Sequence, residues 1–452
     1  MKFYNRTEEL AILKEIVNRK KSDFCYFIGR RRIGKTSLVR YFFEKNNIDY
    51  LYFFVWNKSE WNLLKNFSET LYDFLWFEVN FSSLREFLKF IFEYWKKNPW
   101  LNIVFDEFQN FYYINDEIFS DFQEFWDINK DSSSINIFTI GSIFTLMEKV
   151  FRDKSSPLFW RVTAKIYLDE FEISVLKQIL LDYNIYSTRN LLDVYTLFWW
   201  VPKYLEIFDE LKNKNDNLLE NILSNFYITK NSIFLDEWKD LLIWEFWKSY
   251  STYFSILEAI ASWKTKRSEI ANYTQINYDS LWIYLEKLEK NYWYIEKFNS
   301  IISSKKINRY RIKDNFLIFW FRFIYKRNNL IEIWKYDELI KIINKNITNL
   351  QWFIFEKLVK KLIIKKSRKN EFIINFEQIW NYFDRTWKNE IDLICFSEET
   401  KKVVFIETKL NSKKITKEVK ENLEKKANLI PKFNWYKKYF LYYSLDNLEE
   451  LI

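Results

Sequence analysis

Two of the 3 Gly in this 452-residue chain stand in one short stretch, Gly29-Arg30-Arg31-Arg32-Ile33-Gly34-Lys35-Thr36-Ser37. The stretch fits the pattern G-x-x-x-x-G-K-[ST]. An apolar run over residues 24–28 precedes it, and a helical pattern over residues 37–44 follows it. This order of strand, loop and helix is the context that the pattern requires, so the sequence predicts an α/β domain built around this loop.

The residue types of the loop fit the binding of nucleotide phosphates. Backbone N–H groups from Gly29 through Arg30, Arg31, Arg32, Ile33 and Gly34 would form a nest for anions at the N-terminus of the helix. Lys35 would reach the β- and γ-phosphates, and the Thr36 hydroxyl would bind Mg²⁺, with Ser37 beside it. A chance glycine turn before a helix is the alternative, which the context disfavours. ATP and Mg²⁺ are the expected cofactors.

Three later positions extend this hypothesis. An apolar run over residues 101–105 ends in Asp106 and Glu107; Asp106 would hold the Mg²⁺ shell, and Glu107 would orient and polarise the attacking water. A solvated strand end is the alternative for this pair. A further apolar run, over residues 135–140, ends shortly before Ser142, whose hydroxyl would sense the γ-phosphate because polar strand ends face the ligand in α/β sheets. Arg161 is a candidate charge-stabilising arginine of the site; the alternative is that it is an ordinary surface residue.

Composition limits the remaining chemistry. The absence of histidine excludes Ser-His, Cys-His and His-metal sites, so carboxylates, Lys, Arg and hydroxyls must do the work. The 2 Cys lie in apolar runs, which indicates buried thiols in a reducing compartment. The net charge of +9 weakly favours an anionic partner. The N-terminus has no apolar signal region and no run is long enough for a membrane span, so we expect a cytoplasmic protein without membrane partners.

Tryptophan is unexpectedly common where glycine is expected. The chain has 21 Trp, and several stand at predicted turns where positive φ is favoured, namely Trp199, Trp200, Trp263, Trp293 and Trp387. We hypothesise that the source organism reads UGA as glycine, so that many of these residues are glycine in the cell. The alternative is an aromatic-rich protein from an AT-rich genome. UGG codons at the turn positions would exclude the recoding.

Several segments together resemble the archaeal-type P-loop ATPases, a family related to AAA+ and STAND proteins. They are Phe3-x-x-Arg6-x-x-Glu9-Leu10, the loop, and residues 106–109, 141–142, 157–161, 199–205 and 310–321. The family has glycine where this chain has Trp160, Trp199 and Trp200, which agrees with the recoding hypothesis. An aromatic residue of the family matches Trp320, so we expect that tryptophan to be genuine.

The resemblance implies an α/β multidomain chain. Its parts would be a P-loop ATPase core over 1–169, a helical lid over 170–236, a winged helix-turn-helix over 237–325 and a PD-(D/E)XK nuclease-like domain over 326–452. The third of these also follows from the pattern of three short helices before two strand-like runs. Its expected DNA contacts are Tyr278, Asp279, Ser280 and Tyr284 in the major groove, and Lys264, Lys266, Arg267, Lys305 and Lys306 at phosphates. Docking of a protein is the alternative for this domain.

Acidic residues and one lysine are expected to converge in the last region. Glu390 and Asp392 lie on one predicted strand, and Glu407 and Lys409 on the next, with period-2 spacing. By resemblance, Asp392 and Glu407 would bind Mg²⁺ with help from Glu356 on a helix, and Lys409 would activate water or stabilise the phosphorane-like charge. The alternatives are a solvated strand edge and a domain that binds without cleaving.

The sequence thus favours a Mg²⁺-dependent ATPase. Its candidate partners are ATP, double-stranded DNA and further copies of the same chain. Two alternatives remain open: a nucleotide-switched DNA-binding or scaffold protein with little turnover, and a DNA nuclease gated by ATP.

Overall fold

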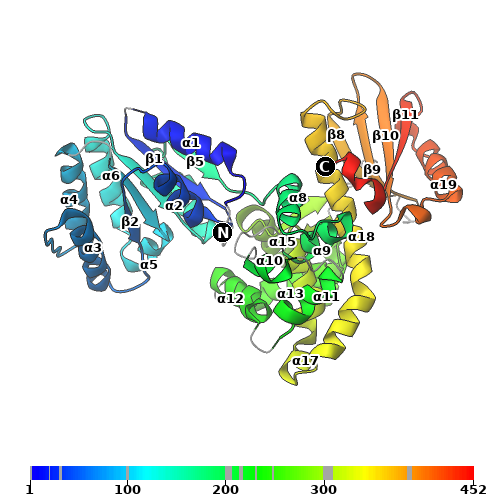
Figure 1. The fold of residues 1–452 in the computed structure, drawn as a ribbon, viewed down its shortest axis with the longest axis horizontal. Helices are drawn as coiled ribbons and strands as arrows, with labels where there is room; N and C mark the ends of the chain where they lie inside the picture. The colour runs from blue at the N-terminus through cyan, green and yellow to red at the C-terminus, as the bar shows by residue number, and fades with distance from the viewer. Residues whose placement is uncertain are drawn as a thin grey trace. The chain divides into compact units, whose positions relative to one another are not determined.

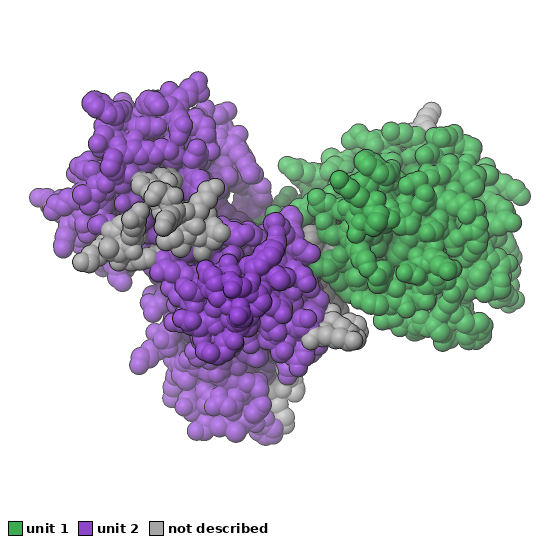
Figure 2. All heavy atoms as spheres, turned by 180° about the vertical axis from the view of Figure 1, so that it is seen from behind, with its two compact units in different colours: residues 1–171, 201–203 green, residues 172–200, 204–452 purple. Residues whose placement is uncertain are grey.

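The computed structural model describes residues 3–19, 21–29, 33–97, 101–198, 206–212, 217–229, 232–246, 249–298, 309–383 and 389–452. The chain forms two compact units, residues 1–171 with 201–203 and residues 172–200 with 204–452 (Figure 2). The break after residue 171 lies close to the end predicted for the ATPase core. The finer division of the second unit stays a prediction, and its proposed boundary at 236/237 falls inside a helix, α12 (Ile233–Phe246).

The first unit contains a five-stranded parallel sheet in the order β2-β3-β4-β1-β5 (Figure 1). Its strands are β1 (Asp23–Ile28), β2 (Tyr50–Phe54), β3 (Asn102–Asp106), β4 (Asn136–Ile140) and β5 (Ala164–Tyr167). The predicted strands over residues 24–28, 101–105 and 135–140 are therefore present. Because all five strands run the same way, their carboxyl ends meet at one edge of the sheet.

Helices cover both faces of this sheet (Figure 1). They are α1 (Thr7–Asn18), α2 (Lys35–Lys45), α3 (Glu60–Leu75), α4 (Leu84–Lys97), α5 (Phe111–Ile114), α6 (Ile118–Asn129) and α7 (Phe144–Arg152). Alternation along β1 sends Phe24 and Tyr26 into a core with α3, α4 and α6, whereas Cys25 and Phe27 pack with α1 and α2. A strand buried on both faces is apolar throughout, which is why β1 reads as one continuous hydrophobic run.

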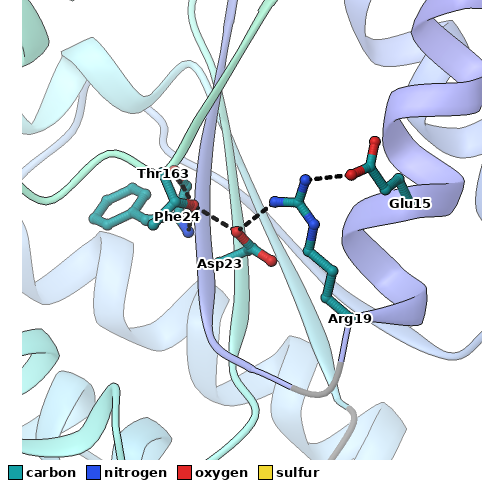
Figure 3. Close-up of polar contacts among 5 residues, drawn as sticks. All are labelled: Glu15, Arg19, Asp23, Phe24 and Thr163. Atoms are coloured by element: carbon teal, nitrogen blue, oxygen red, sulfur yellow. Dashed lines mark hydrogen bonds and ion pairs between the residues drawn. The ribbon is translucent and has the colours of Figure 1, made fainter.

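A polar cluster closes the amino end of β1 (Figure 3). The Thr163 hydroxyl donates to Asp23 Oδ1 at 2.7 Å, and the Phe24 N–H donates to the Thr163 hydroxyl at 2.9 Å. Arg19, at the end of α1, lies 3.5 Å from Asp23 Oδ1 and 2.5 Å from Glu15. These contacts link the end of α1 and Thr163, which directly precedes β5, to the start of β1. The polar side chains at this amino edge of the sheet therefore bind one another.

The second unit begins with helices, as predicted for the lid region. They are α8 (Ile173–Asp182), α9 (Thr188–Leu197), α10 (Glu206–Leu211), α11 (Leu218–Ile222) and α12. Three more follow, α13 (Tyr250–Ala261), α14 (Arg267–Thr274) and α15 (Tyr278–Glu286), and then an antiparallel pair, β6 (Ile295–Phe298) and β7 (Arg309–Ile312). This is the predicted order of three helices and two strands. Lys305 and Lys306 lie outside the described residues.

The C-terminal part contains a four-stranded sheet in the order β11-β10-β9-β8. Its strands are β8 (Gln378–Phe383), β9 (Glu390–Ser397), β10 (Lys402–Thr408) and β11 (Lys437–Tyr443); β10 and β11 are parallel, and the other pairs are antiparallel. The helices of this part are α16 (Asn315–Phe319), α17 (Asn328–Glu332), α18 (Tyr336–Arg368) and α19 (Lys417–Asn428). Among the described residues, no helix combines the length and apolar character needed to cross a bilayer.

Among the residues that the structure describes, four tryptophans adopt positive φ. Trp263 and Trp293, which stand at predicted turns, have φ of 65° and 58°, and Trp76 and Trp334 have φ of 64° and 58°. Glycine tolerates this left-handed region, whereas a bulky side chain there is an outlier. By contrast, Trp320 is buried and its indole N–H donates to the Leu235 carbonyl at 2.9 Å. Trp199, Trp200 and Trp387 lie outside the described residues.

Candidate nucleotide site

The loop between β1 and α2 depends on both of its glycines. Gly29 has φ of 156°, and a Cβ atom there would lie 2.6 Å from the Leu168 carbonyl oxygen. Gly34 has φ of 87° and precedes the first residue of α2. Backbone crowding at the first position and left-handed geometry at the second both exclude larger residues. Arg30, Arg31 and Arg32 lie outside the described residues; Ile33 is buried beneath the loop.

The next two residues begin α2 and point into the predicted site. Lys35 is buried, and its ammonium donates to the Gly29 carbonyl at 2.7 Å, so it lies across the loop. The Thr36 hydroxyl donates to Asp106 Oδ2 at 2.7 Å. The structure thus brings the loop and the end of β3 together, as the sequence predicts. Ser37 is exposed on the first turn of the helix.

Asp106 is buried at the carboxyl end of β3 and accepts hydrogen bonds on both oxygens. Oδ1 accepts from the Glu107 N–H at 2.8 Å, and Oδ2 accepts from the Tyr52 hydroxyl at 2.6 Å as well as from Thr36. Burial, and after it the charge of Asp106, raises the pKa of Tyr52, so this phenol remains a donor. A carboxylate beside a hydroxyl suits Mg²⁺, which takes few protein oxygens and completes its shell with water and phosphate.

Glu107 is held by two side-chain donors. Its backbone is left-handed, with φ of 55°, and its Oε2 accepts from the Ser142 hydroxyl at 2.6 Å and from Gln109 Nε2 at 2.5 Å. Strand β4 lies between β1 and β3, which places Ser142 between the loop and the two carboxylates. Ser142, Glu107 and Asp106 therefore share the edge of the sheet that carries the loop.

Three neighbouring residues have roles that sequence reasoning did not assign. Arg6 Nη2 donates to the Ile33 carbonyl at 3.3 Å, so α1 braces the loop, and its guanidinium lies 4.9 Å from the Phe171 ring centre. Tyr52 and Gln109 orient the two carboxylates. Arg6 and Gln109 belong to segments that carry the family resemblance, which was a signal that they matter; nothing marked Tyr52 except its place on a strand.

Arg161 is not brought to the loop of its own chain. Its guanidinium binds Asp127 Oδ2 at 2.8 and 3.2 Å and holds the pKa of that carboxyl below its ordinary value. The N–H of nearby Thr163 donates to the Phe24 carbonyl at 2.9 Å, at the amino end of β1. The loop follows the other end of this six-residue strand, about 17 Å away at roughly 3.3 Å per residue. The sequence could not show at which end of the sheet Arg161 lies.

A second polar cluster lies on the C-terminal sheet, where the predicted carboxylates and lysine meet. Asp392 is buried and its Oδ2 accepts from the Thr408 N–H and hydroxyl, both at 2.7 Å. Lys409 Nζ donates to Glu407 Oε1 at 2.6 Å. Burial, and after it the charge of Glu407, raises the pKa of Asp392. Lys409 therefore contacts Glu407, and Asp392 is bound by Thr408, the residue between them in the sequence.

Glu356 joins the cluster from α18 through one amide. Asn381 Nδ2 donates both to Glu356 Oε1 and, at 2.6 Å, to the Asp392 carbonyl. Burial, followed by the charge of Asp392, raises the pKa of Glu356. Within the described parts of the chain, no group of three or more Asp, Glu or Cys side chains is arranged to hold a metal ion. The predicted trio of Glu356, Asp392 and Glu407 therefore does not form a closed ligand set here.

Comparison with known proteins agrees with this geometry. Residues 3–206 match a family described as an ATPase domain predominantly from Archaea. The chain contains an archaeal-type P-loop ATPase domain. Residues 320–422 match a second family, described as archaeal and bacterial proteins of unknown function.

Two relatives and one solved structure are similar to this chain. An uncharacterized protein of Methanocaldococcus jannaschii is 28% identical over 448 residues, covering 97% of this chain and 94% of the relative. An uncharacterized ATP-binding protein of the same organism is 44% identical over 46 residues, covering 10% of this chain and 78% of the relative. The Walker-type ATPase of Pyrococcus abyssi has a similar fold, with a TM-score of 0.51 and 20% identity over 71% of this chain and 96% of that one.

Proposed function

We propose that this P-loop ATPase domain binds ATP with Mg²⁺ at the Gly29–Ser37 loop and hydrolyses it. The observation that supports this most strongly is the pair of contacts that join three elements at one sheet edge. Thr36 on α2 contacts Asp106 on β3, and Ser142 after β4 contacts Glu107. Strand-end carboxylates beside a phosphate-binding loop have the arrangement that in-line attack on a γ-phosphate requires.

Each side chain then has a defined task. Lys35 would exchange its contact with the Gly29 carbonyl for phosphate oxygens, because an ammonium binds an anion more strongly than a neutral acceptor. Thr36 and Asp106 would hold Mg²⁺, which supplies charge neutralisation between the phosphates. Glu107 would orient a water molecule for attack, and its two donors, Ser142 and Gln109, fix its direction.

The phosphate contact is tested by Lys35→Ala. ATP affinity, measured by titration with a fluorescent ATP analogue, should fall about a hundredfold because a charge-assisted contact to two phosphates is lost. Lys45→Ala is a matched control on the same helix, since Lys45 is exposed and its ammonium contacts the hydroxyl and the ring of Tyr41. If the Lys35→Ala protein folds and its ATP affinity is unchanged, ATP does not bind at this loop.

Double-stranded DNA is the partner we propose for the α13–β7 segment, on the order of its elements. Two of the residues expected to bind DNA phosphates, Lys266 and Arg267, already contact other side chains of this chain. The Arg267 guanidinium lies 3.9 Å from the Tyr278 ring centre and 3.8 Å from Asp279, and Lys266 lies 3.6 Å from Glu269. DNA phosphates would therefore have to displace these intramolecular partners. Binding of a short duplex with no dependence on salt would rule out such contacts.

A second function is proposed for the C-terminal sheet, namely divalent-cation binding of the nuclease-like type. Its support is the contact of Lys409 with Glu407 beside the buried Asp392. Two carboxylates and a lysine are the groups that metal-assisted phosphodiester hydrolysis uses. Asp392→Asn should abolish Mn²⁺ binding to this sheet, measured by electron paramagnetic resonance, without changing ATP affinity. Equal Mn²⁺ binding by wild type and variant would refute the site.

A further inference from the structure

Three donors hold the carboxylate of Asp106, and they come from three parts of the first unit. Oδ1 accepts from the N–H of Glu107, directly after β3, at 2.8 Å. Oδ2 accepts from the Thr36 hydroxyl on α2 at 2.7 Å and from the Tyr52 hydroxyl on β2 at 2.6 Å. An ionised carboxylate has about four lone-pair sites, so these three bonds leave about one site for a cation.

The Tyr52 side chain is fixed at its ring as well as at its hydroxyl. The ring packs against the core that lies beneath α1 and α2. The guanidinium of Arg40, one helical turn after Thr36, lies 4.4 Å from the ring centre. Arg40 and Thr36 share one face of α2 because residues four apart are neighbours on a helix. Helix α2 therefore holds Asp106 twice, directly through Thr36 and indirectly through Arg40 and Tyr52.

The number of free oxygen sites on a carboxylate discriminates between divalent cations. Mg²⁺ requires near-ideal octahedral geometry, with oxygens at about 2.0–2.1 Å, and it keeps several water molecules. Ca²⁺ takes about six to eight oxygens in flexible geometry and accepts both oxygens of one carboxylate. A fixed carboxylate with about one free site suits Mg²⁺. Without the Tyr52 hydroxyl, a site on Oδ2 becomes free and both oxygens of Asp106 can bind one cation, which suits Ca²⁺.

We propose that the Tyr52 hydroxyl makes the nucleotide site selective for Mg²⁺ over Ca²⁺. Tyr52 is a positioning residue, because it acts through the carboxylate of Asp106. The inference rests on the proposed binding of ATP with Mg²⁺ at the Gly29–Ser37 loop. It adds to that function a determinant of cation choice on β2, a strand outside the loop and outside the acidic end of β3.

The selectivity is tested with Tyr52→Phe, which removes the hydroxyl and keeps the ring. The affinity for a fluorescent ATP analogue is measured in EDTA, with saturating Mg²⁺ and with saturating Ca²⁺. The quantity compared is the factor by which each cation raises the affinity. In Tyr52→Phe the Mg²⁺ factor should fall about tenfold, because a hydrogen bond to a charged group is lost. The Ca²⁺ factor should stay unchanged or rise, and the affinity in EDTA should stay within about twofold.

Tyr50→Phe is the matched control. Tyr50 lies two residues earlier on the same face of β2, where it is paired with Asn102 at the other end of β3, and its ring stacks on Phe43. Both factors should match those of the wild type. A folded Tyr50→Phe protein that loses Mg²⁺ selectivity as strongly as Tyr52→Phe would overturn the assignment to Tyr52.

Three results for Tyr52→Phe would overturn the proposal: an unchanged Mg²⁺ factor, an equal loss in the Mg²⁺ and Ca²⁺ factors, or a loss of affinity already present in EDTA. The last two would show a general loosening of the site, and the nucleotide site itself would stand. Failure of the proposed function is recognised separately. If Lys35→Ala binds the analogue as tightly as the wild type, or if neither cation raises the affinity of the wild type, the proposed binding of ATP with Mg²⁺ fails and the selectivity falls with it.

Discussion

Trp76 provides a direct physical test of the proposal that UGA encodes glycine in the source organism. The residue follows α3, has φ of 64° and ψ of 19°, and its N–H donates to the Tyr72 carbonyl at 2.9 Å. Helices commonly end with a left-handed glycine at such a position. The indole is 85% exposed, so its removal sacrifices little burial. Trp76→Gly should therefore stabilise the first unit.

The expected gain follows from two opposing effects. A left-handed L-residue costs about 1–2 kcal/mol, whereas the extra freedom of glycine in the unfolded chain costs about 0.5–1 kcal/mol. The net gain of about 1 kcal/mol should raise the Tm of the first unit by about 2–4 °C. Differential scanning calorimetry of the full chain measures this, and Mg-ATP identifies the relevant transition by raising it.

The matched control has the opposite sign. Trp320→Gly should destabilise the second unit by about 3–5 kcal/mol, because a buried indole and its bond to Leu235 are lost. A lower Tm for Trp76→Gly would show that the tryptophan is native to this turn. The gene should carry UGA at Trp76, Trp263, Trp293 and Trp334 and UGG at Trp320.

Two further predictions concern single polar contacts. Ser142→Ala removes one of the two donors to Glu107 and should lower kcat for ATP hydrolysis about tenfold at unchanged ATP affinity; an equal loss in affinity would instead indicate a phosphate contact. Burial raises the pKa of Asp193 to about 6, above its unfolded value of about 4, so the folded state binds the proton more tightly and stability falls as pH rises from about 4 to 6. Asp193→Asn should remove this pH dependence, which is worth about 3 kcal/mol. The free energy of unfolding in urea is measured at pH 4 and pH 7. If it changes between these pH values as much in the variant as in the wild type, Asp193 is not the group responsible.

The candidate nucleotide site could be located from the sequence because its signals are local. The loop, Lys35 and Thr36 belong to one continuous pattern, and Asp106 and Glu107 directly end an apolar strand. Ser142 followed from a general property of parallel sheets, whose carboxyl ends share one edge.

Contacts that depend on how distant segments pack in the fold could not be predicted from the sequence. The hydroxyl of Tyr52 reaches Asp106 only because β2 lies next to β3. Arg161 stands near an apolar strand in sequence, but the fold places it at the amino edge of the sheet, where Asp127 binds it. The docking of Arg309 on Phe383 joins segments that are more than seventy residues apart. A pattern within one segment cannot report such contacts.

We infer that this chain hydrolyses ATP at the loop, with Glu107 orienting the attacking water. Phosphate release should be measured with saturating ATP, with and without Mg²⁺, for wild type and Glu107→Gln. We expect turnover by the wild type only when Mg²⁺ is present, and a loss of at least a hundredfold in Glu107→Gln while ATP affinity stays within about twofold. Mg²⁺-dependent turnover that survives in Glu107→Gln would contradict the mechanism, and a wild type that binds ATP without turnover would leave a nucleotide switch in place of an enzyme.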